Sequence, residues 1–403
     1  MKTVIFVGAG RHQKRAIEQA RARGLRVAAV DRNSNAPGLA SADVAEVVDF
    51  MEVDAVIAVA RRIGVDGVLT VSADRAVPVV AAVAEGLGLP GIGTETAHRL
   101  THKLAMRNAL GAHGLPQPPF ASLLSTEDIG AALHAVPLPA VLKPVDSGGQ
   151  RAVFRIESPA ELERDLEEAI AESPTHEAIL EEFVDGVEMN GIVVARDGEP
   201  ALVTLSDRLR PPGIGFGVGW MHVYPPSVNG EQLRLSEHVA VESVRALGLR
   251  NAIAFPQLIA EPGGGVAVVE VAARIPGGQM ADLVRHAVGV DLVEVALRQA
   301  LGEDVPDDVA LPLFSQPLAI RFFTAQPGPL PTGEVLRVGS LDPVLAADGV
   351  VQADTYLQVG ETIRPVRRDG DRRGYVIAIA DSSDEALLRA EHAAGLLEVE
   401  VAT

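Results

Sequence analysis

The sequence of 403 residues contains no cysteine. This absence excludes disulfide bonds, thiolate nucleophiles, cysteine-ligated zinc and cysteine-bound iron–sulfur clusters, and it fits the cytoplasmic location that we expect. No apolar run reaches the 18 residues that a transmembrane helix needs. The N-terminal segment MKTVIFVGAGR also lacks the long apolar stretch and the cleavage site of a signal peptide. We therefore expect no membrane partner.

Positive charge is scarce. The chain has 35 Lys and Arg against 54 Asp and Glu, which gives a formal net charge of −19. Because no block of basic residues offsets this balance, nucleic acid is not an expected partner, and small molecules are. Only four of the basic residues are Lys, namely Lys2, Lys14, Lys103 and Lys143.

The motifs of the common nucleotide-binding and hydrolytic sites are missing. The sequence has no P-loop, no HExxH and no GxSxG. The glycines of Gly8–Gly10 and the acid Asp31 match half of a dinucleotide-binding fingerprint, but Gln13 stands where the third glycine would fall. The pattern favours an ordinary strand–helix turn, or a loop that faces a small substrate.

The pattern of apolar residues predicts a chain of mixed α/β and α+β class. Apolar strands alternate with amphipathic helices over residues 1–93, which predicts an N-terminal parallel α/β domain. The segment from Thr94 predicts a single helix that ends at Gly111–Gly114, before a Pro-rich extended stretch. A second domain is expected over 94–314, with a lid subdomain at about 116–187.

Further elements follow within and after the second domain. A helix is expected over 159–172, between the strands PAVLKPV and AILEEFV, and a hairpin over 252–271. One more helix is expected near 280–301. The third domain, 315–403, reads mainly as strands and closes with a helix over 382–396.

Two of the four lysines occupy positions suited to phosphate. Lys143 ends the strand PAVLK and precedes the loop VDSGGQRAV, whose glycines Gly148 and Gly149 allow backbone N–H groups to approach phosphate oxygens. Lys103 lies in the preceding helical segment, and Ser147 opens the glycine pair. A solvated lysine beside a flexible turn would explain either position alone, but lysine is too rare here for both to be expected by chance.

The segment AILEEFVDGVE contains acidic residues around a short apolar hinge. Its backbone amides and one carboxylate can surround an adenine edge, while a second carboxylate accepts hydrogen bonds from ribose hydroxyls. A solvated acidic turn is the alternative interpretation. The residues concerned are Glu181, Glu182, Phe183, Val184 and Glu188.

The segment VAVVEVAARIPGGQM places a carboxylate and a guanidinium at the end of an apolar strand. Glu270 is expected to be buried and to need a partner, which Mg²⁺ bridging phosphate oxygens would supply. Arg274 can hold a phosphate or a carboxylate with two hydrogen bonds, and Gly277 and Gly278 permit close approach of the backbone. A surface pair between Glu270 and Arg274 is the alternative.

These four elements, in this order, resemble the ATP-grasp superfamily over nearly the whole chain, and most closely carboxylate–amine ligases of the L-amino-acid-ligase type. The resemblance implies ATP and Mg²⁺ as cofactors and an ATP-grasp architecture, with an N-terminal parallel α/β domain, a two-subdomain ATP-binding core and a β-rich C-terminal domain. It also implies that Lys103 and Lys143 contact phosphates, that Lys143 and Arg274 are catalytic, and that Glu270 binds the metal.

Two positions depart from the pattern of this superfamily. The second metal-binding Glu of the family falls at Gln257, and the Asn that often follows the first by two residues is Ala272. An amide oxygen still binds Mg²⁺ but carries less charge. The sequence therefore leaves open whether the site binds one metal ion or two.

Substrate recognition is expected from the loop 207–226, where scarce aromatic residues and arginines gather. Packing at a domain junction is the alternative explanation for this loop. His12 is interpreted as a solvated turn residue, and RPVRRDGDRRG (364–374) as a solvated hairpin turn, with an Arg that faces the site as its alternative. The substrate candidates are Arg208, Arg210, Trp220, His222, Gly277 and Gly278.

The resemblance implies an ATP-dependent ligase that activates a carboxylate as an acyl phosphate and joins it to an amine. Small-molecule carboxylates and amines, among them amino acids, are the expected partners, and a homodimer stays open. Two other functions compete with this one. The first is an ATP-dependent carboxylase of the biotin-carboxylase or purine-pathway type, and the second is a nucleotide-binding module without turnover.

Overall fold

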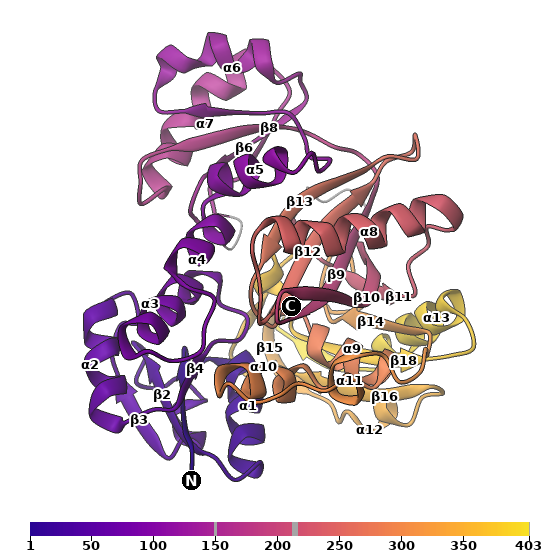
Figure 1. Ribbon diagram of the computed structural model, residues 1–403. Coiled ribbons are helices and arrows are strands. Elements are labelled where there is room, and N and C mark those ends of the chain that lie inside the picture. The colour runs from indigo at the N-terminus through magenta and orange to yellow at the C-terminus, as the bar shows by residue number, and fades with distance from the viewer. Residues whose placement is uncertain (149–150, 212–216, 403) are drawn as a thin grey trace.

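The computed structural model describes residues 1–148, 151–211 and 217–402. Within these ranges the strands form an N-terminal sheet, a lid sheet, a large eight-stranded sheet and a small three-stranded sheet. Figure 1 shows the lid at the top, the N-terminal sheet below it and the large sheet beside both. None of the described helices has the length and apolar character needed to cross a membrane.

The N-terminal sheet is parallel, as predicted, with the strand order β3-β2-β1-β4. Every residue of its central strand β1 is buried, because helices cover both faces of the sheet. The elements of this region are β1 (Thr3–Val7), α1 (Arg11–Ala22), β2 (Arg26–Asp31), β3 (Val44–Val47), α2 (Val53–Ile63), β4 (Gly67–Leu69) and α3 (Val77–Leu87), with 3₁₀ turns η1 (Leu39–Ser41) and η2 (Asp74–Ala76).

In the turn that half matches the dinucleotide-binding fingerprint, the protein's own side chains make the polar contacts. The side chain of Gln13 is buried and donates to the carbonyl of Val71, so it fills the turn where a third glycine would leave space. Asp31 accepts from the backbone N–H of Ala9 at 2.9 Å and from that of Asn33. Both polar groups thus serve the local structure, which fits the interpretation as an ordinary turn.

The single helix predicted from Thr94 is wrong, because the chain breaks at His102. Helix α4 (Thr94–Thr101) ends there, and α5 (Lys103–Ala112) begins one residue later. His102 has extended backbone angles, and its ring accepts the backbone N–H of Ala105. The N–H of Lys103 donates to the carbonyl of Val145 at 2.7 Å, and this tertiary bond opens α5 beside the loop that follows Lys143.

The lid is an antiparallel sheet with two helices on it and its own hydrophobic core. Helix α7 packs Leu162 and Leu166 against Leu142 and Leu180 of the sheet. This core is separate from the others, so the lid forms its own packing unit. Its elements are β5 (Phe120–Leu123), η3 (Thr126–Asp128), α6 (Ile129–Ala135), β6 (Ala140–Pro144), β7 (Phe154–Ile156), α7 (Pro159–Glu172) and β8 (Ala178–Glu182).

The large sheet has the order β13-β12-β9-β10-β11-β14-β18-β16 and is antiparallel throughout. Its last three strands come from beyond residue 314, so the sheet crosses the expected start of the third domain. The strands are β9 (Val187–Arg196), β10 (Glu199–Leu209), β11 (Met221–Tyr224), β12 (Ala252–Ala260), β13 (Val266–Ala272), β14 (Leu318–Phe322), β16 (Val350–Thr355) and β18 (Gly374–Ile379).

The helix predicted near 280–301 is also two helices. Gly289 takes a left-handed conformation (φ 82°) that ends α9, and the side chain of Asp291 caps the start of α10. The remaining elements are α8 (Gly230–Ala246), α9 (Met280–Val288), α10 (Leu292–Ala300), α11 (Asp307–Ala310), β15 (Gly333–Val338), α12 (Asp342–Leu345), β17 (Thr362–Ile363), η4 (Asp369–Asp371), α13 (Ser383–Ala394) and β19 (Val399–Val401).

One hydrophobic core joins the N-terminal sheet to the large sheet. Phe6 of β1 and Ile17 of α1 belong to the same buried cluster as Leu283 of α9 and Phe322 of β14. A parallel bridge between Val71 and Ile275 adds a backbone contact. The N-terminal sheet therefore packs against the large sheet and against the segment after β13 that carries Arg274.

Candidate active site

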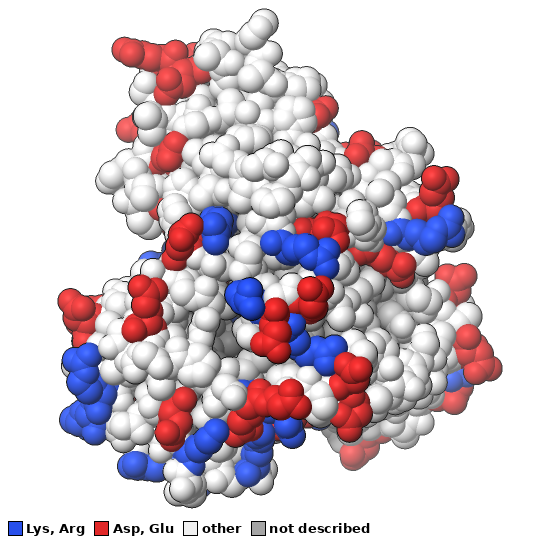
Figure 2. All heavy atoms as spheres, in the orientation of Figure 1, with Lys and Arg blue, Asp and Glu red and all other residues white. Residues whose placement is uncertain are grey.

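A cavity of about 900 Å³ lies where the N-terminal region, the lid and the large sheet meet. Charged side chains of both signs gather around the hollowed middle of this face (Figure 2). The predicted residues found in its wall are Lys103, Lys143, Ser147, Gly148, Glu181, Glu182, Phe183, Val184, Glu188, Arg208, His222, Gln257, Glu270, Arg274, Gly277 and Gly278. Gly149 lies outside the described residues.

The two lysines meet in this wall from different elements. The Nζ of Lys103 donates to the carbonyl of Ser147 at 2.8 Å, and the Nζ of Lys143 lies 2.6 Å from a carboxylate oxygen of Glu181. Burial lowers the pKa of Lys103, and the charge of Glu270 opposes that shift. Two buried ammonium groups and a glycine loop make this end of the cavity suited to a polyanion.

The carboxylate of Glu181 holds Lys143 in place. Burial alone would raise the pKa of Glu181, but the charges and hydrogen bonds of Arg107 and Lys143 lower it to about 2. Arg107 is 1% exposed, and its Nε donates to Glu181 at 2.9 Å. This carboxylate was expected to contact adenine or ribose. Instead, it forms an ion-pair network with Arg107 and Lys143 within the protein.

Arg107 also ties the lid network to the large sheet. Its two terminal nitrogens donate to the carbonyls of Val268 and Val269 at 2.7 Å each, immediately before Glu270 on β13. Sequence reasoning missed this residue. The available signal was an Arg one helical turn after Lys103, at a position where the helix packs inward.

The segment expected to bind adenine ends strand β8 and lines the cavity. Its first amides are used within the protein, since the N–H of Glu182 donates to Pro119 and that of Phe183 to Pro139, both at 2.9 Å. The guanidinium of Arg155 lies 4.2 Å from the centre of the Phe183 ring. The hinge thus offers an apolar wall, and the N–H groups of Glu182 and Phe183 are already engaged within the protein.

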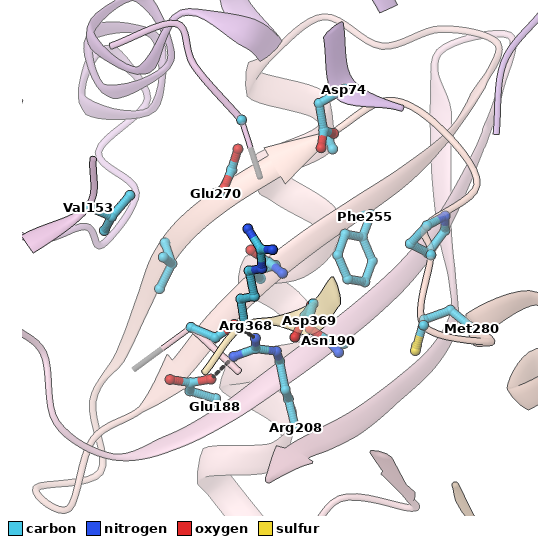
Figure 3. A pocket seen from close by; sticks show the side chains of 18 of the residues that line it. Asp74, Val153, Glu188, Asn190, Arg208, Phe255, Glu270, Met280, Arg368 and Asp369 are labelled. Carbon is cyan, nitrogen blue, oxygen red and sulfur yellow. Dashed lines mark hydrogen bonds and ion pairs between the residues drawn. The ribbon is translucent and has the colours of Figure 1, made fainter. Parts of the chain in front are cut away.

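The expected ribose contact, Glu188, also has partners of its own. Its carboxylate lies 2.5 Å from Arg208 and 3.1 Å from Arg210. Figure 3 shows the pair of Glu188 and Arg208 on one side of the cavity. A ribose hydroxyl would have to share this carboxylate with two guanidinium groups.

The two expected metal ligands are neighbours across two strands. Gln257 of β12 lies opposite Glu270 of β13, and Asn190 of β9 lies opposite Gln257. Asn190 presents a buried side-chain oxygen that has no hydrogen-bond partner among the described residues. Within the same ranges, Glu270 forms no ion pair, and no group of three His, Asp or Glu residues is arranged to hold a metal alone. Oxygen donors in a row fit Mg²⁺ that is shared with phosphates.

Arg274 pairs across the domain boundary and not with Glu270, so the alternative of a Glu270–Arg274 surface pair is wrong. Its Nε lies 2.6 Å from Oδ1 of Asp74 in the N-terminal region. One terminal nitrogen of Arg274 is buried without a hydrogen-bond partner among the described residues, and so can donate to a ligand. Asp74 was missed by the sequence reasoning, although it follows a parallel strand at the end where sites commonly form.

The expected substrate loop divides between the cavity and the protein interior. Arg208 and His222 face the cavity, whereas Arg210 and Trp220 are not part of its described wall. The indole of Trp220 donates to Thr324 at 3.2 Å and stacks with Arg321. Packing at the junction, the alternative weighed for this loop, explains Trp220.

His222 is buried beside two arginines. Burial lowers its pKa well below the usual value, and the charges of Arg372 and Arg208 lower it further. The amide of Asn190 lies 3.3 Å from Nδ1, so a neutral ring that accepts there carries its proton on Nε2. A Cβ on Gly278 would approach Nε2 of His222 and Nη1 of Arg372 at 3.2 Å each, and φ at this glycine is 65°.

The interpretation of 364–374 as a solvated turn is wrong for Arg372. The alternative, an Arg of this segment that faces the site, is correct. The side chain of Arg372 is 9% exposed, pairs with Asp369 and lies 4.2 Å from the centre of the Phe322 ring. It faces the cavity together with Arg368. His12 also lines the cavity, and burial followed by the charge of Arg372 lowers its pKa.

Three family models match successive parts of the chain. The model "Carbamoyl-phosphate synthase L chain, ATP binding domain" matches residues 101–307, just over half of the chain. "ATP-grasp N-terminal domain" matches 17–91, and "L-amino acid ligase C-terminal domain 2" matches 321–402.

Curated relatives are distant in sequence. A formate-dependent phosphoribosylglycinamide formyltransferase of Ignicoccus hospitalis is 26% identical over 408 residues, which cover 98% of this chain and 95% of that protein. The uncharacterized protein y4rH of Sinorhizobium fredii is 27% identical over 304 residues. That match covers 72% of this chain but only 59% of the relative's length.

Two solved structures share the fold over nearly their whole length. An L-amino acid ligase from Bacillus licheniformis has a TM-score of 0.83 and 21% identity, with 100% of this chain and 99% of that chain covered. A phosphoribosylglycinamide synthetase from Anaerococcus prevotii has a TM-score of 0.79 and 17% identity, with both chains fully covered.

Proposed function

Because this chain belongs to the ATP-grasp superfamily of ATP-dependent ligases, we propose that it activates a small carboxylate with ATP and joins it to an amine. The observation that carries the proposal is the convergence of Lys103, Lys143 and Glu270 on one cavity. These groups come from α5, the lid and the large sheet. A bound triphosphate explains why the fold brings two ammonium groups and a carboxylate together.

The cavity residues have separable roles in this reaction. Lys103, Lys143 and the described part of the glycine loop bind the phosphates of ATP, and the segment after β8 packs against the base. Glu270 and Gln257 would hold Mg²⁺, which would neutralise part of the phosphate charge. Arg274, with its buried free donor, binds the transferring phosphoryl group and then the acyl phosphate.

The protein needs no covalent nucleophile for this chemistry. The substrate carboxylate attacks the γ-phosphorus, ADP is released from that phosphorus, and an acyl phosphate forms. An amine then attacks the acyl carbon and inorganic phosphate leaves. Positioning and the exclusion of water matter most, because water would otherwise hydrolyse the acyl phosphate.

An amino acid is the favoured substrate. Support comes from the match of residues 321–402 to the L-amino acid ligase C-terminal domain, and these residues contribute Arg368 and Arg372 to the cavity. Cationic groups there suit the carboxylate of an amino acid. A phosphorylated amine is the second candidate, because a relative named for phosphoribosylglycinamide aligns along 98% of the chain.

The test is ADP release with Mg²⁺ and ATP against panels of amino acids and phosphorylated amines, with products identified by mass. An amide that has lost one water from its two substrates supports the ligase. A product that has gained carbon dioxide would instead indicate a carboxylase. ATP binding without stimulated turnover across both panels would indicate a binding module.

A further inference from the structure

Asp74 is the carboxylate that the N-terminal region contributes to the cavity. It begins η2, five residues after the end of β4, and its side chain is 37% exposed. Its Oδ1 accepts from Nε of Arg274 at 2.6 Å. Figure 3 shows the side chains of Asp74 and Glu270 in the upper part of the view, both of which line the cavity. Asp74 therefore lies beside the residue assigned to the acyl phosphate.

One carboxylate oxygen of Asp74 is available to a ligand. Within the described ranges, its Oδ2 has no hydrogen-bond partner, whereas most other carboxylates of the cavity are engaged. Of the remaining two, Glu270 is assigned to the metal and Glu182 lies on the lid in the segment assigned to the base. The engaged carboxylates are Glu181 with Lys143 and Arg107, Glu188 with Arg208 and Arg210, and Asp369 with Arg372 and the N–H of Gly219.

The turn that carries Asp74 is fixed against the segment that carries Arg274. The N–H of Ser72 donates to the carbonyl of Ile275 at 2.9 Å, next to the Val71–Ile275 bridge. Ser72 has φ 59°, an unfavourable conformation for a non-glycine residue that tends to persist at functional sites. Its hydroxyl is buried and has no hydrogen-bond partner among the described residues. The turn thus holds two unused polar groups next to Arg274.

We infer that Asp74 binds the amino group of the acceptor substrate and accepts its proton during amide formation. This inference rests on the proposed function. At neutral pH an aliphatic amine is mainly an ammonium ion, which a carboxylate attracts but which has no lone pair for attack. A single carboxylate can bind the ammonium group by its charge, and by taking up a proton it can also give the nitrogen the lone pair that it needs for attack.

The second half of the reaction then balances as follows. The amine nitrogen attacks the acyl carbon, the C–N bond forms, and the C–O bond to phosphate breaks. Inorganic phosphate leaves with the electron pair of that bond. The nitrogen loses two protons in all. Oδ2 of Asp74 takes the first from the ammonium group before the attack and releases it to solvent, and it accepts the second as the amide forms. Arg274 stays on Oδ1 and keeps the carboxylate next to the reacting carbon.

The test compares two nucleophiles in the same enzyme. Hydroxylamine is a weak base that is neutral at neutral pH, so it traps the acyl phosphate as a hydroxamate without needing an ammonium site. In Asp74→Asn, amide formation should fall about 100-fold relative to hydroxamate formation, which is the range for the loss of a general base. The KM for the amine should rise as well, and raising the pH should recover part of the lost amide formation.

Two control variants accompany this comparison. Asp54→Asn removes a carboxylate from an exposed position of α2 in the same region and should leave the ratio of amide to hydroxamate unchanged. Asp74→Glu keeps a carboxylate and should restore part of the ratio. If Asp74 served only to place Arg274, both products would fall together in Asp74→Asn, and the inference would be overturned.

The outcomes also separate the inference from the proposed function. An unchanged ratio in Asp74→Asn, with hydroxamate formed by the wild-type enzyme, overturns the role of Asp74 alone. The absence of any hydroxamate from wild-type enzyme, ATP, Mg²⁺ and a full panel of carboxylates overturns the ligase function, and the role of Asp74 with it.

Discussion

The two ends of the cavity are built in different ways. The end assigned to ATP uses short motifs near strand ends, with Lys143, Ser147 and Gly148 within six residues of sequence and Glu270 on a strand of the large sheet. The end assigned to the acceptor takes single residues from four distant segments, and its guanidinium groups, such as Arg372, are paired with nearby acids. Residues that stand in a short motif can be recognised in a sequence, whereas residues that packing brings together, such as Asp74 and Arg372, were missed or misjudged.

The largest effect is expected from Lys143→Ala. Loss of this charge at the phosphates should reduce ADP formation at least about 1,000-fold, the upper range for one stabilising donor. The chain should stay folded, because Arg107 still pairs with Glu181. Steady-state ADP release and a thermal melt would check this. Retained turnover would show that the ATP end has been placed wrongly.

Arg107→Ala should destabilise the fold most. It removes one of the two cationic partners of Glu181 and leaves the carbonyl groups of Val268 and Val269 without their donor in a buried site, which costs about 3 kcal/mol or more. Denaturant unfolding measures the loss. Arg61→Ala, an exposed helical arginine, is the control and should change stability by less than about 0.5 kcal/mol. Equal effects would mean that the network does not couple lid and sheet.

His222 should make the acceptor end sensitive to acid. Its pKa in the folded chain lies well below 6.5, so the unfolded chain binds the proton first and stability falls as the pH drops below about 6.5. Between pH 7 and pH 5 the wild type should lose about 2 kcal/mol more than His222→Gln. Unfolding curves at both values test this, and parallel losses would contradict a neutral buried ring.

Arg372→Lys should have the smallest effect of the four substitutions. It should change binding of the acceptor and leave binding of ATP unchanged. The substitution keeps the charge but loses the planar fork, so the KM for an anionic acceptor should rise about tenfold. The KM for ATP should stay near the wild-type value. A larger change for ATP than for the acceptor would remove the distinction between the two ends.

The sequence predicted the fold class, and it predicted residues that the structure brings together in one cavity, because local patterns determine both. The buried run of β1, the helix at 159–172 and the hairpin of β12 and β13 follow from periodicity and turn residues. The breaks at His102 and Gly289 were missed, since tertiary contacts and caps interrupt otherwise continuous helical patterns. Local sequence cannot show those contacts.

The missed and misjudged site residues share one property. Asp74 and Arg107 each act through a partner that is distant in sequence, such as Arg274, which lies 200 residues from Asp74. Arg372 is brought into the site by packing on the distant Phe322 ring. Trp220 was misjudged for the related reason that an aromatic side chain packs equally well at a junction as in a site. Only the assembled sheet shows which of these side chains face the cavity.

The most direct test of the central claim is a crystal structure with Mg²⁺ and a non-hydrolysable ATP analogue. The account predicts the β- and γ-phosphates within about 3 Å of the Nζ atoms of Lys103 and Lys143, with the metal ion on Glu270. A nucleotide bound elsewhere on the chain, with these three side chains left without contact to it, would contradict the account.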